Sequence, residues 1–176
     1  MDISAITDNS FLQQLKKDLG TSLVYATLTG GAIYDLLKGR LVKDWDFLPS
    51  QGLTDKLNEI AVLTNTTSTA TTYLHKGEII QVLKKDKSCF PFTIEQATFR
   101  LSNNLLIIDE QSIKTKILIP SSDVYHTEDL RVIVNCLRRL KHWEKKGMCM
   151  TDLTYNSILS LIKPPKVEDT EDEYES

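Results

Sequence analysis

The sequence predicts an α+β fold in which helices pack on a mixed β-sheet and further helices follow at the C-terminal end. Three observations lead to this prediction. Strand-like and helix-like segments alternate up to residue 63, strand-like segments dominate from residue 69 to residue 109, and a long helical pattern begins at residue 128. The length of 176 residues suits one domain, alone or with a helical appendage.

Five elements are expected in the first part of the chain. They are, in order, a helix from residue 10 to residue 19, a β-rich run over 22–28, a short helix over 32–38, a strand over 43–48 and a helix over 53–63. Ser10 is the expected N-cap of the first helix, because its hydroxyl can accept a hydrogen bond from a free backbone N–H group. Gly20 ends that helix, and Pro49 closes the strand.

Strand pairs and then two helices are expected in the second part. The elements are a hairpin of residues 69–75 and 78–84 around Lys76-Gly77, a second strand pair of residues 91–100 and 105–109, a long helix over 128–146 and a helix over 152–162. Residues 64–72, which are rich in Thr and Ser, are expected to form a solvated loop that leads into a strand. Thr127 is the expected cap of the long helix, and Gly147 ends it.

The segment from residue 28 to residue 48 carries the chemistry. Gly30 and Gly31 allow the backbone to turn tightly and to approach a ligand, and the helix that follows would direct its first N–H groups at the same place, where phosphate binds well. Because side chains of a strand alternate between faces, Asp44 and Asp46 should share one face while Trp45 lies on the other. This pattern predicts a phosphate-binding turn beside paired carboxylates.

A divalent cation is the expected occupant of the carboxylate pair. Two carboxylates so close repel each other unless a cation lies between them, and oxygen ligands of this kind suit Mg²⁺ or Mn²⁺. The alternative reading is a strand–turn–helix unit with two solvated Asp residues on an edge strand. No P-loop or dinucleotide-binding spacing is present.

The same residues resemble a known family. The run Gly30-Gly31-x-Ile33-x-Asp35-x-Leu37-x-Gly39-Arg40-x-x-x-Asp44-x-Asp46 is similar to the signature of the poly(A) polymerase head domain, in the tRNA nucleotidyltransferase branch of the DNA polymerase beta-like superfamily. Two later blocks extend the resemblance in the family's order. They are residues 92–97 with 105–109, and residues 128–133, which resemble the start of the family's neck helix.

The resemblance implies a nucleotidyltransferase head over residues 1–124 and a helical neck over 125–163, and composition predicts an acidic, disordered tail over 164–176. It implies that Asp44 and Asp46 are the catalytic residues and the metal ligands, and that a nucleoside triphosphate is the substrate. The nucleotide-binding residues would be Gly30, Gly31, Arg40 and Lys43. Asp35 is expected to be structural and to pair with a nearby cation.

The long helix carries the residues that could contact RNA. The candidates are Arg131, Arg138 and Arg139, the last two within a basic run that continues with Lys141, Lys145 and Lys146. The other reading of this run is an ordinary solvated helix face.

Several positions depart from the family's pattern. Tyr34 stands where the family usually has Arg, and residues 89–91 replace an Arg-Arg-Asp triplet. Glu95 replaces an Asn. The superfamily often has a third carboxylate on a neighbouring strand, where this chain has Gln81 at the matching position and Glu78 nearby.

Three functions stay open on the sequence alone. The first is metal-dependent, template-independent addition of nucleotides to an RNA 3′ end, with a tRNA-like acceptor. The second is a nucleotidyltransferase whose acceptor is a protein or a small molecule. The third is an inactive head domain that serves as a binding or regulatory module.

Composition indicates a cytoplasmic protein without a membrane segment. No signal peptide or long apolar run is present, and three cysteines without metal-like spacing are expected to be free thiols. The formal net charge of −3 comes from residues 166–176, which hold six acids, and the rest of the chain is slightly basic. This tail is expected to be a solvating end or a segment that folds over a basic groove and mimics nucleic acid.

Overall fold

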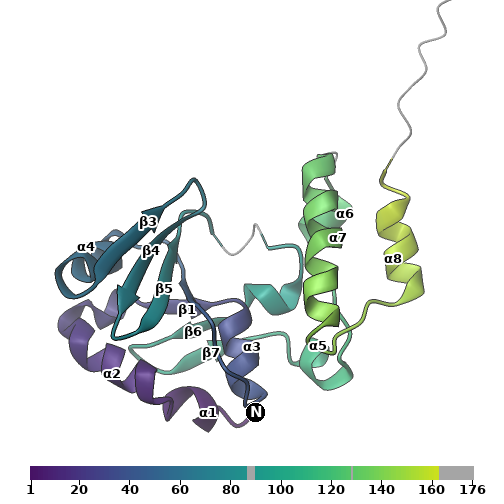
Figure 1. The fold of residues 1–176 in the computed structure, drawn as a ribbon. Helices are drawn as coiled ribbons and strands as arrows, with labels where there is room; N and C mark the ends of the chain where they lie inside the picture. Colours follow the sequence, from purple (N-terminus) through teal and green to yellow (C-terminus); the bar gives the residue numbers. More distant parts are fainter. Residues whose placement is uncertain (87–89, 128, 163–176) are drawn as a thin grey trace, which may run out of the picture.

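The computed structural model describes residues 1–86, 90–127 and 129–162. Its centre is a seven-stranded sheet in the order β3-β4-β5-β2-β1-β6-β7 (Figure 1). The strands are β1 (Thr27–Thr29), β2 (Trp45–Phe47), β3 (Val62–Thr66), β4 (Ala70–His75), β5 (Glu78–Leu83), β6 (Thr98–Arg100) and β7 (Leu105–Ile107). β2 and β5 pair in parallel and every other pair is antiparallel, so the prediction of a mixed sheet is confirmed.

Helices lie before, between and after the strands of the described chain. They are α1 (Ser4–Thr7), α2 (Ser10–Leu19), η1 (Gly20–Tyr25), α3 (Gly31–Leu37), α4 (Gln51–Ile60), η3 (Thr93–Gln96), α5 (Glu110–Thr115), α6 (Ser122–Tyr125), α7 (Leu130–Glu144) and α8 (Asp152–Leu159). Figure 1 shows α7 and α8 standing together beside the part of the molecule that contains the sheet. This arrangement confirms the predicted α+β fold with C-terminal helices. In the described ranges, every helix is too short or too polar to cross a membrane.

The main core lies between one face of the sheet and the N-terminal helices. Leu12, Leu15 and Leu19 of α2 are buried in it at helical spacing, together with side chains from α3, α4 and the strands. Along β5, Ile80 and Val82 enter this core, whereas Gln81 between them points to the other face. The sheet therefore has one covered face and one face that is available to a site.

A second core joins α7 to the rest of the chain. The buried residues of α7 follow helical spacing, and they pack with side chains from α3, η3, α5, α6 and α8. These α7 residues are Ile133, Cys136, Leu140 and Trp143. The predicted apolar stripe of the long helix is thus present, although the division of the chain at residue 124 stays a prediction.

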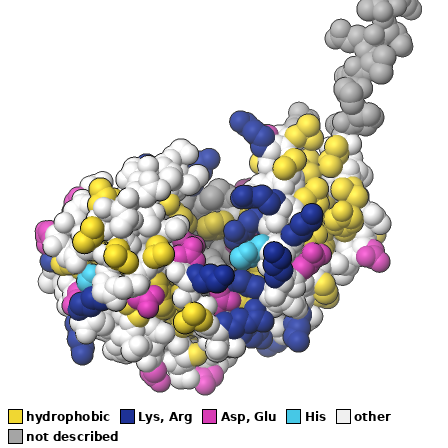
Figure 2. Space-filling model, in the orientation of Figure 1, with side chains coloured by type: hydrophobic (Ala, Val, Ile, Leu, Met, Phe, Trp, Pro, Cys, Tyr) yellow, Lys and Arg dark blue, Asp and Glu magenta, His cyan; other side chains and the backbone are white. Residues whose placement is uncertain are grey.

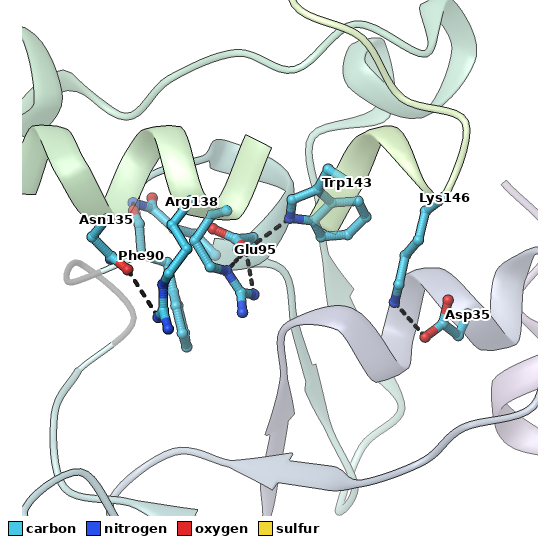
Figure 3. Close-up of polar contacts among 9 residues, drawn as sticks. Asp35, Phe90, Glu95, Asn135, Arg138, Trp143 and Lys146 are labelled. Atoms are coloured by element: carbon cyan, nitrogen blue, oxygen red, sulfur yellow. Dashed lines mark hydrogen bonds and ion pairs between the residues drawn. The ribbon is translucent and has the colours of Figure 1, made fainter. Parts of the chain in front are cut away.

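A buried carboxylate fixes α7 against η3. Glu95 is fully buried, and its Oε1 accepts hydrogen bonds from Arg139 Nε at 2.6 Å and from Trp143 Nε1 at 2.7 Å (Figure 3). Arg139 also forms an ion pair with this carboxylate. Glu95 Oε2 has no hydrogen-bond partner among the described residues. Because an unpaired buried charge is costly, Arg139 is the partner on which this contact depends.

The hairpin prediction is confirmed and several boundaries are wrong. Lys76 and Gly77 join β4 to β5 with φ angles of 51° and 87°, as a type I′ turn requires. The run over 22–28 forms η1 and a strand of three residues, and residues 93–96 form η3, because tertiary context overrides β-propensity. The edge strand β3 overlaps the end of the helix predicted over 53–63 and the start of the loop predicted over 64–72.

Two helix caps also differ from the prediction. Asn9, not Ser10, accepts the hydrogen bond from Leu12 N at the start of α2. Asp129, not Thr127, is the cap of α7, and Thr127 Oγ1 instead accepts from Asp129 N. Each cap is one or two residues from the predicted position, which is the usual error when several capping residue types are adjacent. The predicted features at Cys89, Glu128 and residues 163–176 lie outside the described residues, whereas Cys136 and Cys149 are free thiols.

The two adjacent arginines of α7 should contribute very differently to stability. Arg139→Met leaves the buried Glu95 carboxylate without its cation and should lower the free energy of unfolding by about 3 kcal/mol at pH 7. Arg138→Met is the matched control, because Arg138 is exposed and bonds Asn135 Oδ1 at 3.2 Å, and it should cost less than about 1 kcal/mol. Urea unfolding of both variants measures the difference, and equal losses would contradict the assigned role of Glu95.

Candidate functional site

Most of the predicted site residues line one cavity of about 300 Å³. It lies between the β1–α3 turn, the segment that leads into β2 and the C-terminal end of α7. The residues that were predicted from sequence and line it are Gly31, Arg40, Lys43, Asp44, Asp46 and Arg139. Gly30 borders it, because a methyl group placed on Gly30 would lie 3.7 Å from Asp46 Oδ2. The turn and the carboxylates are therefore adjacent.

The glycine turn has a conformation that other residues rarely adopt. Gly30 has a φ of 75°, and its N–H donates to Ala97 O at 3.3 Å. The buried Thr29 hydroxyl also donates to Ala97 O, at 2.8 Å, so this donor is directed at the residue between η3 and β6 and not at the cavity. Because α3 has seven residues, its dipole is small. The dipole of this helix therefore contributes little to anion binding at the turn.

Asp46 carries an unusual charge environment. It lies between the buried Trp45 and Phe47 but points to the opposite face of the sheet, as the alternation predicted. Burial raises the pKa of the Asp46 carboxyl to about 7, and the negative charge of Asp44 acts in the same direction, whereas Arg139 opposes it. Asp44 is exposed and precedes β2. The environment of Asp46 therefore disfavours its ionised form.

The donor set fits a hard divalent cation with few protein ligands. The described ranges contain no group of three or more His, Cys, Asp or Glu residues that could hold a metal ion. Two carboxylates would thus bind Mg²⁺ while water or a phosphate completed its shell, which is the usual arrangement for this ion. A cation there would also favour the ionised form of Asp46, against the burial and the charge of Asp44 that raise its pKa.

The place for a third carboxylate holds an amide. Gln81 of β5 is the register partner of Asp46 across the parallel pair of β2 and β5. Glu78 lies on the other face, where it accepts a hydrogen bond from Trp45 Nε1 at 2.9 Å. Glu78 is therefore a partner of the core tryptophan and is separated from Asp46 by the sheet.

The end of α7 adds residues that the sequence analysis did not place in the site. Lys146 Nζ forms an ion pair with Asp35 Oδ2 at 2.6 Å, which supplies the cation expected for Asp35 (Figure 3). His142 lines the same cavity, and burial together with the charges of Arg139 and Lys146 lowers its pKa. The signal was available in part, because positions 139, 142 and 146 share one face of a helix.

The three arginines proposed as RNA contacts are not gathered in one place. Arg131 lies at the start of α7, forms an ion pair with Asp129 at 2.8 Å and lines a separate cavity of about 430 Å³. Arg138 and Arg139 line a further cavity of about 290 Å³ beside Phe90. Arg139 thus lies between that cavity and the site with Asp46. Figure 2 shows Lys and Arg side chains gathered along α7 where it faces the sheet.

The raised pKa of Asp46 predicts that the metal-free protein loses stability as the pH rises from about 4 to about 7. In the unfolded chain Asp46 ionises near its ordinary value of about 4, whereas the folded chain keeps the proton until about pH 7. The folded state binds more protons in this window, so the melting temperature falls through it. Asp46→Asn should remove this part of the pH dependence. Scanning calorimetry in EDTA tests it, and a constant difference between the two proteins from pH 4 to pH 7 would exclude the raised pKa.

Comparison with known proteins identifies the fold. No protein-family model matches the sequence. No curated protein matches it either. Solved structures do match. The CCA-adding enzyme of Thermotoga maritima complexed with tRNA superposes with a TM-score of 0.70 and 18% identity over 92% of this chain and 45% of that one. A CCA-adding enzyme in complex with CTP gives a TM-score of 0.70 and 17% identity over 91% and 46%.

A third solved structure agrees with these two. The Bacillus stearothermophilus CCA-adding enzyme in complex with CTP gives a TM-score of 0.62 and 19% identity over 85% of this chain and 42% of that one. The chain thus spans less than half the length of the solved proteins that it matches. At these identities the likeness concerns the fold, which is the one that the resemblance implied. Over about nine tenths of its length, the chain has the fold of the tRNA CCA-adding enzymes.

Proposed function

We propose that the chain is a metal-dependent, template-independent nucleotidyltransferase that adds a nucleotide to an RNA 3′ end, with a tRNA-like acceptor. One observation carries the proposal. The glycine turn and the carboxylates of Asp44 and Asp46 line one cavity together with several cations. This combination matches what the transfer of a charged phosphoryl group requires, namely a cradle for the phosphates and oxygen ligands for a metal.

The reaction would replace a phosphoanhydride bond of the nucleoside triphosphate by a phosphodiester bond to the acceptor. The 3′ oxygen of the acceptor forms a bond to the α-phosphorus, the bond between that phosphorus and the bridging oxygen breaks, and pyrophosphate leaves with the bonding pair. The hydroxyl proton passes to solvent. Mg²⁺ or Mn²⁺ held by Asp44 and Asp46 would supply the Lewis acid that stabilises the charge developing on the reacting oxygens.

The cations of the site would bind and orient the triphosphate. Arg40 and Lys43 follow α3 and lie on the same cavity as the carboxylates. The Arg40 guanidinium lies 5.6 Å from the ring of Tyr34, and its Nη2 donates to Lys146 O at 3.1 Å, so its position is fixed on two sides. A preorganised cation costs little ordering when a nucleotide binds.

Two further findings support a nucleotide substrate and an RNA acceptor. The matched proteins were solved in complexes with CTP, with ATP or with tRNA. In this chain, the basic side of α7 borders the cavity with Asp46, and Arg138 stands exposed next to it. An RNA backbone passing the site would meet these charges, and such contacts weaken steeply with added salt.

A nucleotide-binding module without catalysis is the second candidate. Gln81 beside Asp46 favours it, because a neutral amide holds a metal less firmly than a carboxylate would. A nucleotidyltransferase with a protein or small-molecule acceptor is a variant of the first proposal and uses the same site.

Substitution of either aspartate tests the proposal. Asp44→Asn and Asp46→Asn should each lower the rate of nucleotide incorporation by at least about 10³-fold, because each removes charge from the metal site. Glu78→Gln is the matched control, since Glu78 belongs to the adjacent strand but lies behind the sheet, and it should retain the rate within a few-fold. The measurement follows α-labelled nucleotides with Mg²⁺ and either short RNAs or cell extract.

Each outcome of this assay has a meaning. Label on RNA that both aspartate variants abolish supports the proposal. Label on protein or on a small molecule keeps the chemistry and changes the acceptor. Nucleotide binding without label in the wild type leaves the binding module as the function.

A further inference from the structure

We infer that Lys146, at the end of α7, is a ligand of the substrate's triphosphate, so that nucleotide binding bridges the β1–α3 turn and α7. The inference rests on the proposed function and deepens it, because it adds a phosphate contact from the end of α7 to those from the β1–α3 turn and from the segment after α3. Lys146 is more than 110 residues from the glycine turn in sequence.

The position of the ammonium group is the first argument. A methyl group placed on Gly31 would lie 3.3 Å from Lys146 Nζ, so the charge is directly over the turn. The same cavity contains Asp44 and Asp46. A phosphate chain cradled by the turn and bound to a cation on the aspartates would therefore pass within reach of Nζ.

The backbone of Lys146 is held in place on both sides. Its N–H donates to Trp143 O at 2.9 Å, and its carbonyl accepts from Arg40 Nη2 at 3.1 Å. The Nζ lies 5.2 Å from the centre of the Trp143 ring, and the side chain is 17% exposed. A lysine that is already confined in this way loses little side-chain entropy on binding an anion.

The ion pair with Asp35 leaves binding capacity on both partners. An ammonium group has three N–H donors, and the bond to Asp35 Oδ2 uses one of them. The other carboxylate oxygen, Asp35 Oδ1, is buried and has no hydrogen-bond partner among the described residues. Lys146 can thus keep Asp35 as an anchor while its remaining donors face the cavity.

The charges of α3 favour a cation supplied by another part of the chain. Between Gly31 and Leu37 the helix carries one acid, Asp35, and no basic residue. A triphosphate placed at the start of this helix would meet the negative charges of Asp35, Asp44 and Asp46. Lys146 supplies a positive charge beside Gly31, where α3 begins. Arg40 and Lys43 instead follow the C-terminal end of this helix.

The test compares the affinity for ATP with that for AMP in the full chain, with Mg²⁺ present. Lys146→Gln should weaken ATP binding by about 10- to 100-fold, the loss of one charge-assisted contact, and leave AMP binding unchanged. Lys145→Gln is the matched control, because Lys145 is adjacent and exposed, and it should leave both affinities unchanged. Calorimetric titration gives the dissociation constants.

Asp35→Asn separates phosphate binding from a structural role. It breaks the same ion pair but keeps the ammonium group, so it should preserve the preference for ATP over AMP within about threefold, well inside the tenfold loss expected for Lys146→Gln. If the ion pair were purely structural, both variants would have a lower melting temperature. The preference for ATP over AMP would then change equally in both variants or stay unchanged in both, and either result overturns the inference. Asp35→Asn also gives an answer if Lys146→Gln does not fold. Loss of the preference for ATP over AMP in Asp35→Asn would by itself overturn the inference.

Hydrogen exchange provides a readout that does not depend on catalysis. ATP with Mg²⁺ should slow exchange of the amides from residue 143 to residue 148 in the wild type and not in Lys146→Gln. If the wild type binds no nucleoside triphosphate, the proposed function fails and the inference fails with it. If the wild type binds ATP and Lys146→Gln binds it equally well, the inference alone is wrong.

Discussion

The contact of Glu95 with Arg139 and Trp143 is the constraint on which the site depends. One buried carboxylate oxygen accepts from both side chains, and these lie one turn apart on α7. The backbone carbonyl oxygen of Glu95 would lie 4.0 Å from a methyl group placed on Gly30. η3 therefore touches the glycine turn with its backbone and holds α7 with its side chain. The basic end of α7 faces Asp46 because of this arrangement.

The site balances opposite charges that come from different parts of the fold. The sheet and the segment before β2 supply Asp46 and Asp44, and burial makes the first of these expensive to ionise. The cations come from the segment after α3 and from the C-terminal end of α7. The cavity therefore needs both α7 and the part of the chain that contains the sheet. A site divided in this way depends on the packing of the second core, in which Tyr34 and Trp143 meet with ring centres 5.1 Å apart.

Local patterns predicted the fold class, the hairpin at Lys76-Gly77 and the position of Asp46 on the face opposite to Trp45 and Phe47. They succeeded because strand alternation, glycine turns and helical stripes depend on residues close in sequence. The ion pair of Lys146 with Asp35 spans 111 positions and the contact of Arg139 with Glu95 spans 44, so no periodicity reveals them. Glu95 was noted as a departure from a family pattern, but its burial and its partners follow from tertiary packing alone.

The edge strand β3 has a consequence for how copies of the chain behave toward one another. All five of its residues are exposed, and the sequence from residue 61 to residue 74 contains no charged side chain and no proline. Sheet edges are normally guarded by such residues against pairing with another molecule. A register irregularity between Leu63 and Asn65 distorts this edge, which is one recognised form of protection. At this edge, any protection against pairing with another molecule therefore comes from the irregularity, because the strand itself carries no charge.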